Sequence, residues 1–210
     1  MFSNLELNRS LVSQNNHRFM AKSSKQVSDS SMLSEWEEIQ AAQKDPKKFR
    51  PLYERYFESI FAFIQKRTGE TSLSGDICSQ VFLKAMQKLD KYKYKGVPFS
   101  AWLYRIAHNE VAQHYRNNSK QRVVSIEENQ IEELIDELDY DFTKDVLQDL
   151  LVLCLDSLSD TELNLIELRF FDKKPFKEIA TILDITESNA KVKTYRITKK
   201  MKTIILKAKS

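Results

Sequence analysis

The chain contains little glycine, proline or cysteine. Only three Gly and four Pro residues occur among its 210 residues, so it has few of the residues that break helices or form tight turns. Leu, Lys, Glu, Ile and Gln are abundant, and most of these residues favour helices. The composition therefore predicts an all-α protein.

Cysteines and long apolar runs are also scarce. Cys78 and Cys154 lie far apart in helix-like sequence, so we expect two buried thiols rather than a disulfide. No apolar run approaches the roughly 18 residues that cross a membrane, and no signal peptide opens the chain. We expect a cytoplasmic protein without membrane insertion.

The sequence also lacks the residue patterns that enzymes use. Its three histidines, His17, His108 and His114, have no Cys or carboxylate partners at metal-ligand spacing. No glycine-rich phosphate loop is present. We therefore expect a protein that is not an enzyme and that has no catalytic residues, metal or cofactor.

Charge is distributed unevenly along the chain. Residues 119–160 contain three basic and 12 acidic residues, a net charge of −9, although the whole chain has a net charge of +3. Together with the helical periodicity, this pattern predicts two small helical domains joined by an acidic flexible linker. The expected divisions are a disordered or weakly helical tail (1–34), a first domain (35–118), the linker (119–144) and a second domain (145–210).

The second domain ends in a helix-turn-helix pattern. Apolar residues at helical spacing after Pro175 predict a short helix, and a break at residues 184–186 follows it, with Thr186 as the N-cap of the next helix. That helix, predicted over 187–206, is rich in Lys and Arg. A short helix, a tight turn and a basic second helix place side chains in the DNA major groove. The sequence therefore predicts DNA binding.

The first domain contains three predicted helices and a basic, aromatic segment. One helix ends near Gly69, Ser74 is a candidate N-cap of the second, and the third covers 99–115. Lys and Arg side chains bind the phosphates of the nucleic-acid backbone, and aromatic rings stack on bases that have left the duplex. The segment is therefore predicted to bind melted DNA rather than intact duplex. The alternative is that Phe99 and Trp102 belong to the core. The residues that form the pattern are Lys88, Lys91, Tyr92, Lys93, Tyr94, Lys95, Phe99, Trp102, Tyr104, Arg105 and Arg116.

Several segments resemble bacterial sigma factors of the sigma-70 family, extracytoplasmic-function group. Residues 99–109, FSAWLYRIAHN, resemble the promoter-melting helix, and residues 76–85, DICSQVFLKA, resemble the preceding helix, which docks on polymerase. Residues 158–180 resemble the C-terminal domain, and 188–200 resemble its recognition helix for the minus-thirty-five element. The motifs occur in the family's order.

The resemblance implies a role for each segment. The protein would bind core RNA polymerase at the β′ clamp and β flap, recognise and melt promoter DNA, and pair with an anti-sigma factor. The linker would follow the polymerase's basic channel, and the 90–98 loop would hold a base flipped from the non-template strand. The implied minus-ten residues are Lys91, Tyr92, Lys93, Tyr94, Phe99, Trp102, Tyr104, Arg105 and Asn109. The implied minus-thirty-five residues are Ser188, Asn189, Lys191, Lys193, Thr194, Arg196 and Lys199, and the implied docking residues are Asp76, Gln80 and Phe82.

The sequence departs from the family pattern at three positions. Asp184 replaces a usual Gly in the turn, Ser79 replaces a usual Gln, and Ala190 replaces a larger apolar residue. Two other interpretations remain at this point. One is a helix-turn-helix regulator that acts on duplex DNA without replacing a sigma factor. The other is a helical interaction module that docks on polymerase, or binds an anti-sigma factor as a decoy, without recognising a promoter.

Overall fold

The computed structural model describes residues 29–118, 151 and 153–209, and its elements within these ranges are helices, with no strand. The chain divides into two compact units, Met1–Ser125 and Ile126–Ser210. The prediction of an all-α protein with two helical domains is confirmed. The predicted acidic linker and most of the predicted tail lie outside the described residues.

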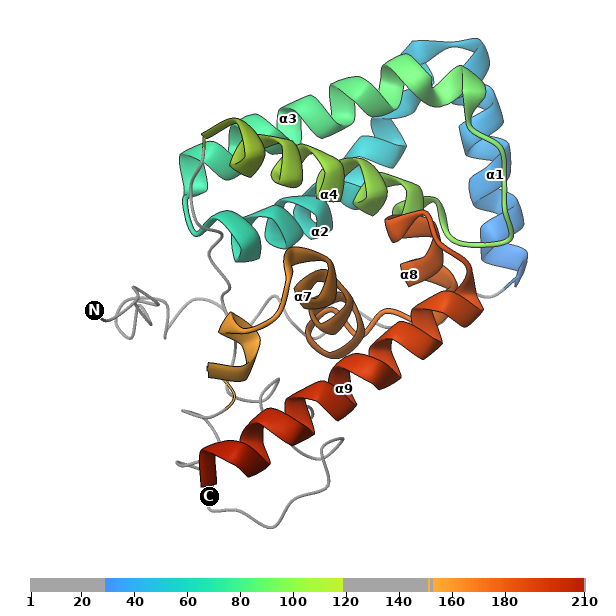
Figure 1. The fold of residues 1–210 in the computed structure, drawn as a ribbon. Helices are drawn as coiled ribbons and strands as arrows, with labels where there is room; N and C mark the ends of the chain where they lie inside the picture. Colours follow the sequence, from blue (N-terminus) through green and yellow to red (C-terminus); the bar gives the residue numbers. More distant parts are fainter. Residues whose placement is uncertain (1–28, 119–150, 152, 210) are drawn as a thin grey trace, which may run out of the picture. The chain divides into compact units, whose positions relative to one another are not determined.

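The first unit is built around the helices α2, α3 and α4, which pack against one another. Figure 1 shows α3 and α4 side by side and α1 across one end of the unit, where it meets the turns η3 and η4. Leu52 and Ile60 of α2 and Leu103 of α4 are completely buried in this unit. The elements are α1 (Asp29–Lys44), η3 (Pro46–Phe49), α2 (Arg50–Thr68), α3 (Thr71–Lys88), η4 (Leu89–Lys91) and α4 (Phe99–Asn118).

The ends of α2 follow the local sequence signals. The side chain of Asp45 accepts a hydrogen bond of 3.0 Å from the Lys47 amide at the start of η3. Pro51 lies in the first turn of α2, where a missing N–H is harmless because that group has no partner inside the helix. Gly69 ends the helix with a φ of 69°, a left-handed conformation that suits glycine.

Two helices start at other residues than the sequence signals indicate. The helix α1 begins at Asp29, inside the predicted tail. The helix α3 begins at Thr71, so Ser74 is not its N-cap. The Ser74 hydroxyl is instead buried inside the helix, where it donates to the Glu70 carbonyl at 2.6 Å and pairs with the Thr68 hydroxyl at 2.7 Å. Ser74 therefore links the connection between α2 and α3, a tertiary role that a cap pattern cannot reveal.

A buried carboxylate lies beneath the N-terminus of α4. Glu35, on α1, is 7% exposed and accepts a hydrogen bond of 3.1 Å from the Phe99 backbone N–H. It also accepts the hydroxyl hydrogen of Tyr56, and the Arg55 guanidinium lies 3.5 Å away. Burial, followed by the neighbouring Glu35 charge, raises the pKa of Tyr56, which therefore keeps its proton and remains a donor.

The second unit contains the predicted helix-turn-helix. Its described elements are helical residues at 151 and 153–156, α7 (Asp160–Ile166), the π-helical segment η5 (Glu167–Phe171), α8 (Phe176–Leu183) and α9 (Glu187–Lys209). Both α7 and α8 pack against α9. Ala190, Ile197, Met201 and Ile205 give α9 a buried stripe at helical spacing.

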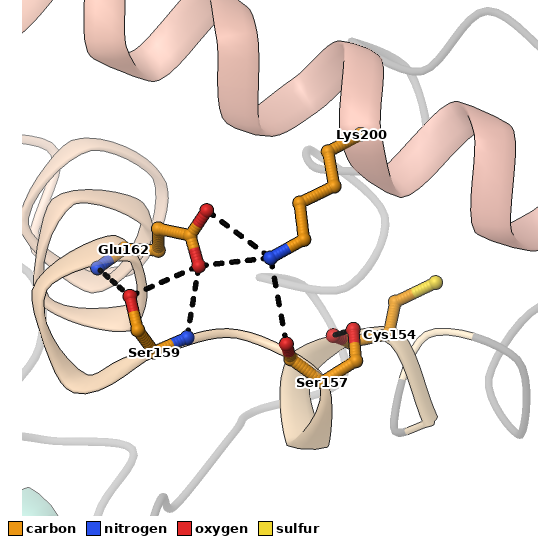
Figure 2. Close-up of polar contacts among 5 residues, drawn as sticks. All are labelled: Cys154, Ser157, Ser159, Glu162 and Lys200. Carbon is orange, nitrogen blue, oxygen red and sulfur yellow. Dashed lines mark hydrogen bonds and ion pairs between the residues drawn. The ribbon is translucent and has the colours of Figure 1, made fainter.

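A capping box at the start of α7 is linked to α9 through Lys200, as Figure 2 shows. The Ser159 hydroxyl accepts from the Glu162 amide at 3.4 Å, and the Glu162 carboxylate accepts from the Ser159 amide at 2.9 Å. The Lys200 ammonium then donates to both Glu162 oxygens, at 3.1 and 2.9 Å. Lys200 thus joins two helices of the unit, although the sequence groups it with the basic residues of the last helix.

Both cysteines are free and buried, which confirms the prediction of two structural thiols. Burial raises the pKa of the Cys78 thiol to about 11, so little reactive thiolate forms near neutral pH. Among the described residues, no helix is both long enough and apolar enough to span a membrane.

Replacing Glu35 should destabilise the first unit. Glu35→Ala leaves the Phe99 N–H and the Tyr56 hydroxyl buried without their acceptor, and we expect the free energy of unfolding to fall by about 3 kcal/mol. The two tryptophans of the chain, Trp36 and Trp102, both lie in this unit. Tryptophan fluorescence during urea unfolding therefore reports this unit, and the exposed Glu37 provides the control, Glu37→Ala. Equal midpoints for the two variants would contradict this role of Glu35.

Acid should weaken the second unit partly through Glu162. The Ser159 backbone hydrogen bond, followed by Lys200, lowers the pKa of Glu162 below the ordinary value of 4.5. A lowered folded-state pKa stabilises the fold above the unfolded pKa, and this stabilisation disappears as the pH falls through the folded value. Glu162→Gln keeps a side chain suited to the capping box but removes the charge. Amide exchange in α7 and α9 should therefore differ between variant and wild type near neutral pH and converge well below pH 4.5; a pH-independent difference would contradict this assignment.

Candidate nucleic-acid interface

One face of α4 carries the polar residues that the sequence predicts for the minus-ten element. Asn109 is exposed, while Trp102 and Arg105 are half-buried. Their spacing places all three on one side of the helix, and the exposed Gln113 and Arg116 continue the same stripe toward the end of the helix. The structure therefore brings together Trp102, Arg105 and Asn109 on one surface.

The 90–98 loop, which begins within η4 and leads into α4, presents lysines to solvent. Lys91, Lys93 and Lys95 are exposed, and Tyr94 keeps 37% of its surface accessible. Gly96 turns the chain with a φ of 68° before α4 begins. The exposed part of the loop thus combines three cations with one accessible aromatic ring.

Three of the predicted base-stacking residues instead belong to the core. Phe99 is 1% exposed, Tyr104 8% and Tyr92 9%. The Tyr104 ring packs edge-on against Phe63 at 5.0 Å, and Phe99 lies 5.1 Å from Tyr92. The prediction that these three rings stack on DNA is wrong for this conformation, because their faces are already covered by other side chains. For Phe99, the core alternative is correct.

Trp102 lies between the exposed residues of α4 and the buried aromatic rings of the core. Its ring centroid is 4.9 Å from that of Tyr92 and 5.3 Å from that of Phe99, yet the side chain remains half-buried. It therefore covers the core with one part of its ring and reaches the α4 surface with the rest.

The predicted docking residues also separate into exposed and buried positions. Asp76 and Gln80 are exposed on α3, whereas Phe82 is 3% exposed and packs 4.8 Å from Tyr53. Phe82 therefore lies in the core rather than on the exposed surface where the prediction placed it. Leu83 and Met86, which are 57% and 44% exposed, continue the stripe that begins at Asp76. The helical period counted from Asp76 would have selected Leu83 instead of Phe82.

The recognition helix α9 exposes most of its predicted contact residues. Thr194, however, is 5% exposed, and its hydroxyl donates to the Ala190 carbonyl at 2.9 Å, so its predicted DNA contact is wrong. Lys191 is exposed and forms an ion pair of 2.7 Å with Glu187. The other predicted residues are half-buried Lys193 and exposed Ser188, Asn189, Arg196 and Lys199.

Two apolar residues on the same helix were not predicted. Tyr195 is 69% exposed and Val192 is 47% exposed, and both share a face with Ser188 and Lys199. Large apolar side chains that point to solvent from a DNA-reading helix can contact the methyl group of thymine. Their position opposite the buried stripe of α9 was readable from the helical period.

The turn before α9 tolerates the unusual Asp184. This residue adopts the left-handed conformation, with φ 57° and ψ 45°, and the Ile185 amide donates to the Ala180 carbonyl at 3.0 Å. The Thr186 hydroxyl accepts from the Asn189 amide at 3.2 Å, which confirms Thr186 as the cap. Ala190 is completely buried, so its small side chain is part of the interior of this unit.

Two regions of one protein family match successive parts of this chain. Residues 52–121 match Sigma-70 region 2, and residues 148–201 match Sigma-70, region 4. The chain belongs to the sigma-70 family, in its extracytoplasmic-function group. The region 2 match includes α4 and the preceding loop, and the region 4 match includes α8 and most of α9.

Named relatives agree with this assignment. The chain is 35% identical over 92 residues to the ECF RNA polymerase sigma factor BldN of Streptomyces coelicolor, covering 43% of this chain and 34% of BldN. It is 25% identical over 160 residues to the RNA polymerase sigma factor YlaC of Bacillus subtilis, covering 75% of this chain and 92% of YlaC. The chain thus spans about a third of the length of BldN and most of YlaC.

Solved structures share the fold. CnrH in complex with the cytosolic domain of CnrY is similar with a TM-score of 0.50 and 20% identity, over 82% of this chain and 96% of that chain. The sigma factor RpoE in complex with the anti-sigma factor NepR, from Bartonella quintana, is similar with a TM-score of 0.50 and 18% identity, over 76% of this chain and 97% of that chain.

Tyr195 provides a test of the α9 surface. Because its side chain is exposed, Tyr195→Ala should change the free energy of unfolding by no more than about 0.5 kcal/mol. It should nevertheless weaken the use of the upstream promoter element by polymerase containing this protein, roughly three- to tenfold. Transcription from promoters with and without that element measures the effect, and Thr203→Ala, at an exposed position farther along α9, is the control. An equal loss for Tyr195→Ala on both promoters would exclude a contact to the element.

Proposed function

We propose that this protein is a sigma factor that binds core RNA polymerase and directs promoter recognition, promoter melting and transcription initiation. The observation that supports this most strongly is the presence of both sigma-70 regions, in order, on one chain. Each region also carries its own exposed polar surface, one on α4 and one on α9.

Recognition would be shared between the two units. Each surface offers only a few contacts, so neither unit alone should bind a promoter tightly. Linking two weak sites raises the effective concentration of the second once the first is bound. Polymerase would set the distance between the sites, because the sigma factor would be held on it at both ends.

The minus-ten element would be read by α4 and the preceding loop. Asn109 and Arg105 would contact base edges, and Trp102 would lie at the edge of the opened strand. The exposed lysines of the loop would follow the phosphates. Tyr94 is the accessible aromatic ring of this loop and would stack on the extracted base. The buried Tyr92, Phe99 and Tyr104 would support this surface from below.

Polymerase would be contacted through α3. Asp76 and Gln80 supply polar groups, and the exposed Leu83 and Met86 supply apolar area that a partner would bury. We assign this stripe to the β′ clamp and the second unit to the β flap. The acidic residues at 119–144 would follow the polymerase's basic nucleic-acid channel.

An anti-sigma factor is a further expected partner. The two solved structures with similar folds are described as a sigma factor with NepR and as CnrH with the cytosolic domain of CnrY. An inhibitor of this chain would cover the docking stripe on α3 or the surfaces on α4 and α9. The proposed role needs no catalytic chemistry in this chain, because the polymerase forms the RNA bonds.

Run-off transcription tests the proposal directly. Purified core polymerase and a genomic fragment library should give new start sites only when this protein is added, and these starts should share two upstream elements. Asn109→Ala should reduce them about tenfold, since one polar base contact contributes 1–3 kcal/mol. Gln40→Ala, at an exposed position on α1, is the control. No new starts, together with binding of duplex DNA by this protein alone, would instead indicate a helix-turn-helix regulator.

A further inference from the structure

One face of α1 is directed at the loop that leads into α4. Met32, Glu35, Trp36 and Gln43 recur at helical spacing, and each contacts the loop or the residue that follows it. We call these four residues the α1 brace. Met32 lies in the tail predicted from sequence and Glu35 is the first residue after it, so the sequence analysis did not predict that this segment contacts the loop.

Gln43 holds the beginning of the loop. Its side-chain amide donates to the Leu89 carbonyl at 2.8 Å and to the Tyr92 carbonyl at 3.0 Å. The side-chain amide therefore donates both of its hydrogens, one to each of two carbonyls that lie about one helical turn apart in η4 and at its end. Gln43 is half-buried, so water competes less for these carbonyls than it would at an open surface.

Trp36 and Met32 support the middle of the loop. The centroid of the Trp36 ring lies 6.1 Å from that of Tyr92 and 6.1 Å from that of Tyr94. The Tyr94 hydroxyl also lies 3.6 Å from the sulfur of Met32. The accessible ring of Tyr94 is thus backed by α1 while part of its surface remains open.

Glu35 holds the end of the loop. Its carboxylate accepts the backbone N–H of Phe99, the first residue of α4. The loop is therefore attached to α1 at both ends and in its middle, while its lysines face solvent.

Resting on the proposed function, we propose that the α1 brace presets the 90–98 loop for the base extracted from the non-template strand, with Gln43 as its main positioning residue. Extracting a base costs a few kcal/mol of stacking. A loop that also had to become ordered would add a conformational cost to each opening event. A loop already held in shape avoids that cost, so the brace acts on promoter opening without touching DNA.

The test compares Gln43→Met with wild type on a promoter found by run-off transcription. Methionine keeps the length of the side chain but removes both donors. Gln40→Met, on the exposed side of α1, is the matched control. Opening is followed by permanganate reactivity of unpaired thymines, and association with core polymerase is measured separately. Single abasic sites are then placed, one at a time, along the non-template strand of the minus-ten element.

We expect Gln43→Met to open the intact promoter about tenfold less than wild type, because two hydrogen bonds are lost. Core association and the Gln40→Met control should remain at wild-type levels. At one abasic position the two proteins should become equal, because the loop then has no base to hold.

Several results would overturn the proposal. Equal opening of the intact promoter by both proteins would show that Gln43 does not position the loop. The same deficit at every abasic position, or a parallel loss of core association, would indicate general damage to the first unit. Gln43→Glu provides a second variant, since a carboxylate cannot donate to either carbonyl; wild-type opening by that variant would also exclude the role. Failure of wild type to start transcription on any fragment would instead remove the proposed function, and the brace with it.

Discussion

A single buried carboxylate organises the first unit. The side chain of Glu35 is 9% exposed, and a charge removed from water must find compensating donors. It finds them on α2, through Tyr56 and Arg55, and at the first residue of α4, through the Phe99 N–H. These groups are separated by as many as 64 positions in sequence. The start of α4 is therefore fixed by a helix near the other end of the unit, and so is the end of the loop before it.

This constraint explains how the aromatic residues are divided. Tyr92 and Phe99 pack into the interior beside Glu35, and burial, followed by the Glu35 charge, raises the pKa of Tyr92 so that its hydroxyl stays neutral. Tyr94 lies two positions along the loop and stays accessible. Alternate residues of the loop thus serve the core and the surface. A segment rich in Lys and Tyr can be predicted from sequence to form a nucleic-acid surface. Which of its rings are buried and which stay accessible depends on contacts with α1, and the sequence does not show these contacts.

The sequence predicted structural features well where they depend on residues only a few positions away. The predicted Thr186 cap depends on neighbouring backbone groups, and the structure confirms it. Phe82 and Thr194 were wrongly assigned to surfaces, although counting the helical period from Asp76 or from Ala190 would have placed both inside. Ser74 and Gln43 could not have been assigned, because their partners depend on how helices pack together.

The energetics of opening show why such distant support would matter in a sigma factor. A protein without ATP chemistry must draw the cost of unstacking a base from binding energy. Each unit presents a small polar surface, so little binding energy is available beyond what positions the DNA. Ordering a nine-residue loop at the moment of opening would consume a large part of it, at roughly 1–2 kcal/mol per residue of backbone. A loop attached to α1 through Gln43, Trp36 and Glu35 bears that cost during folding instead. Stability of the first unit and efficiency of opening are then coupled, because the same contacts provide both.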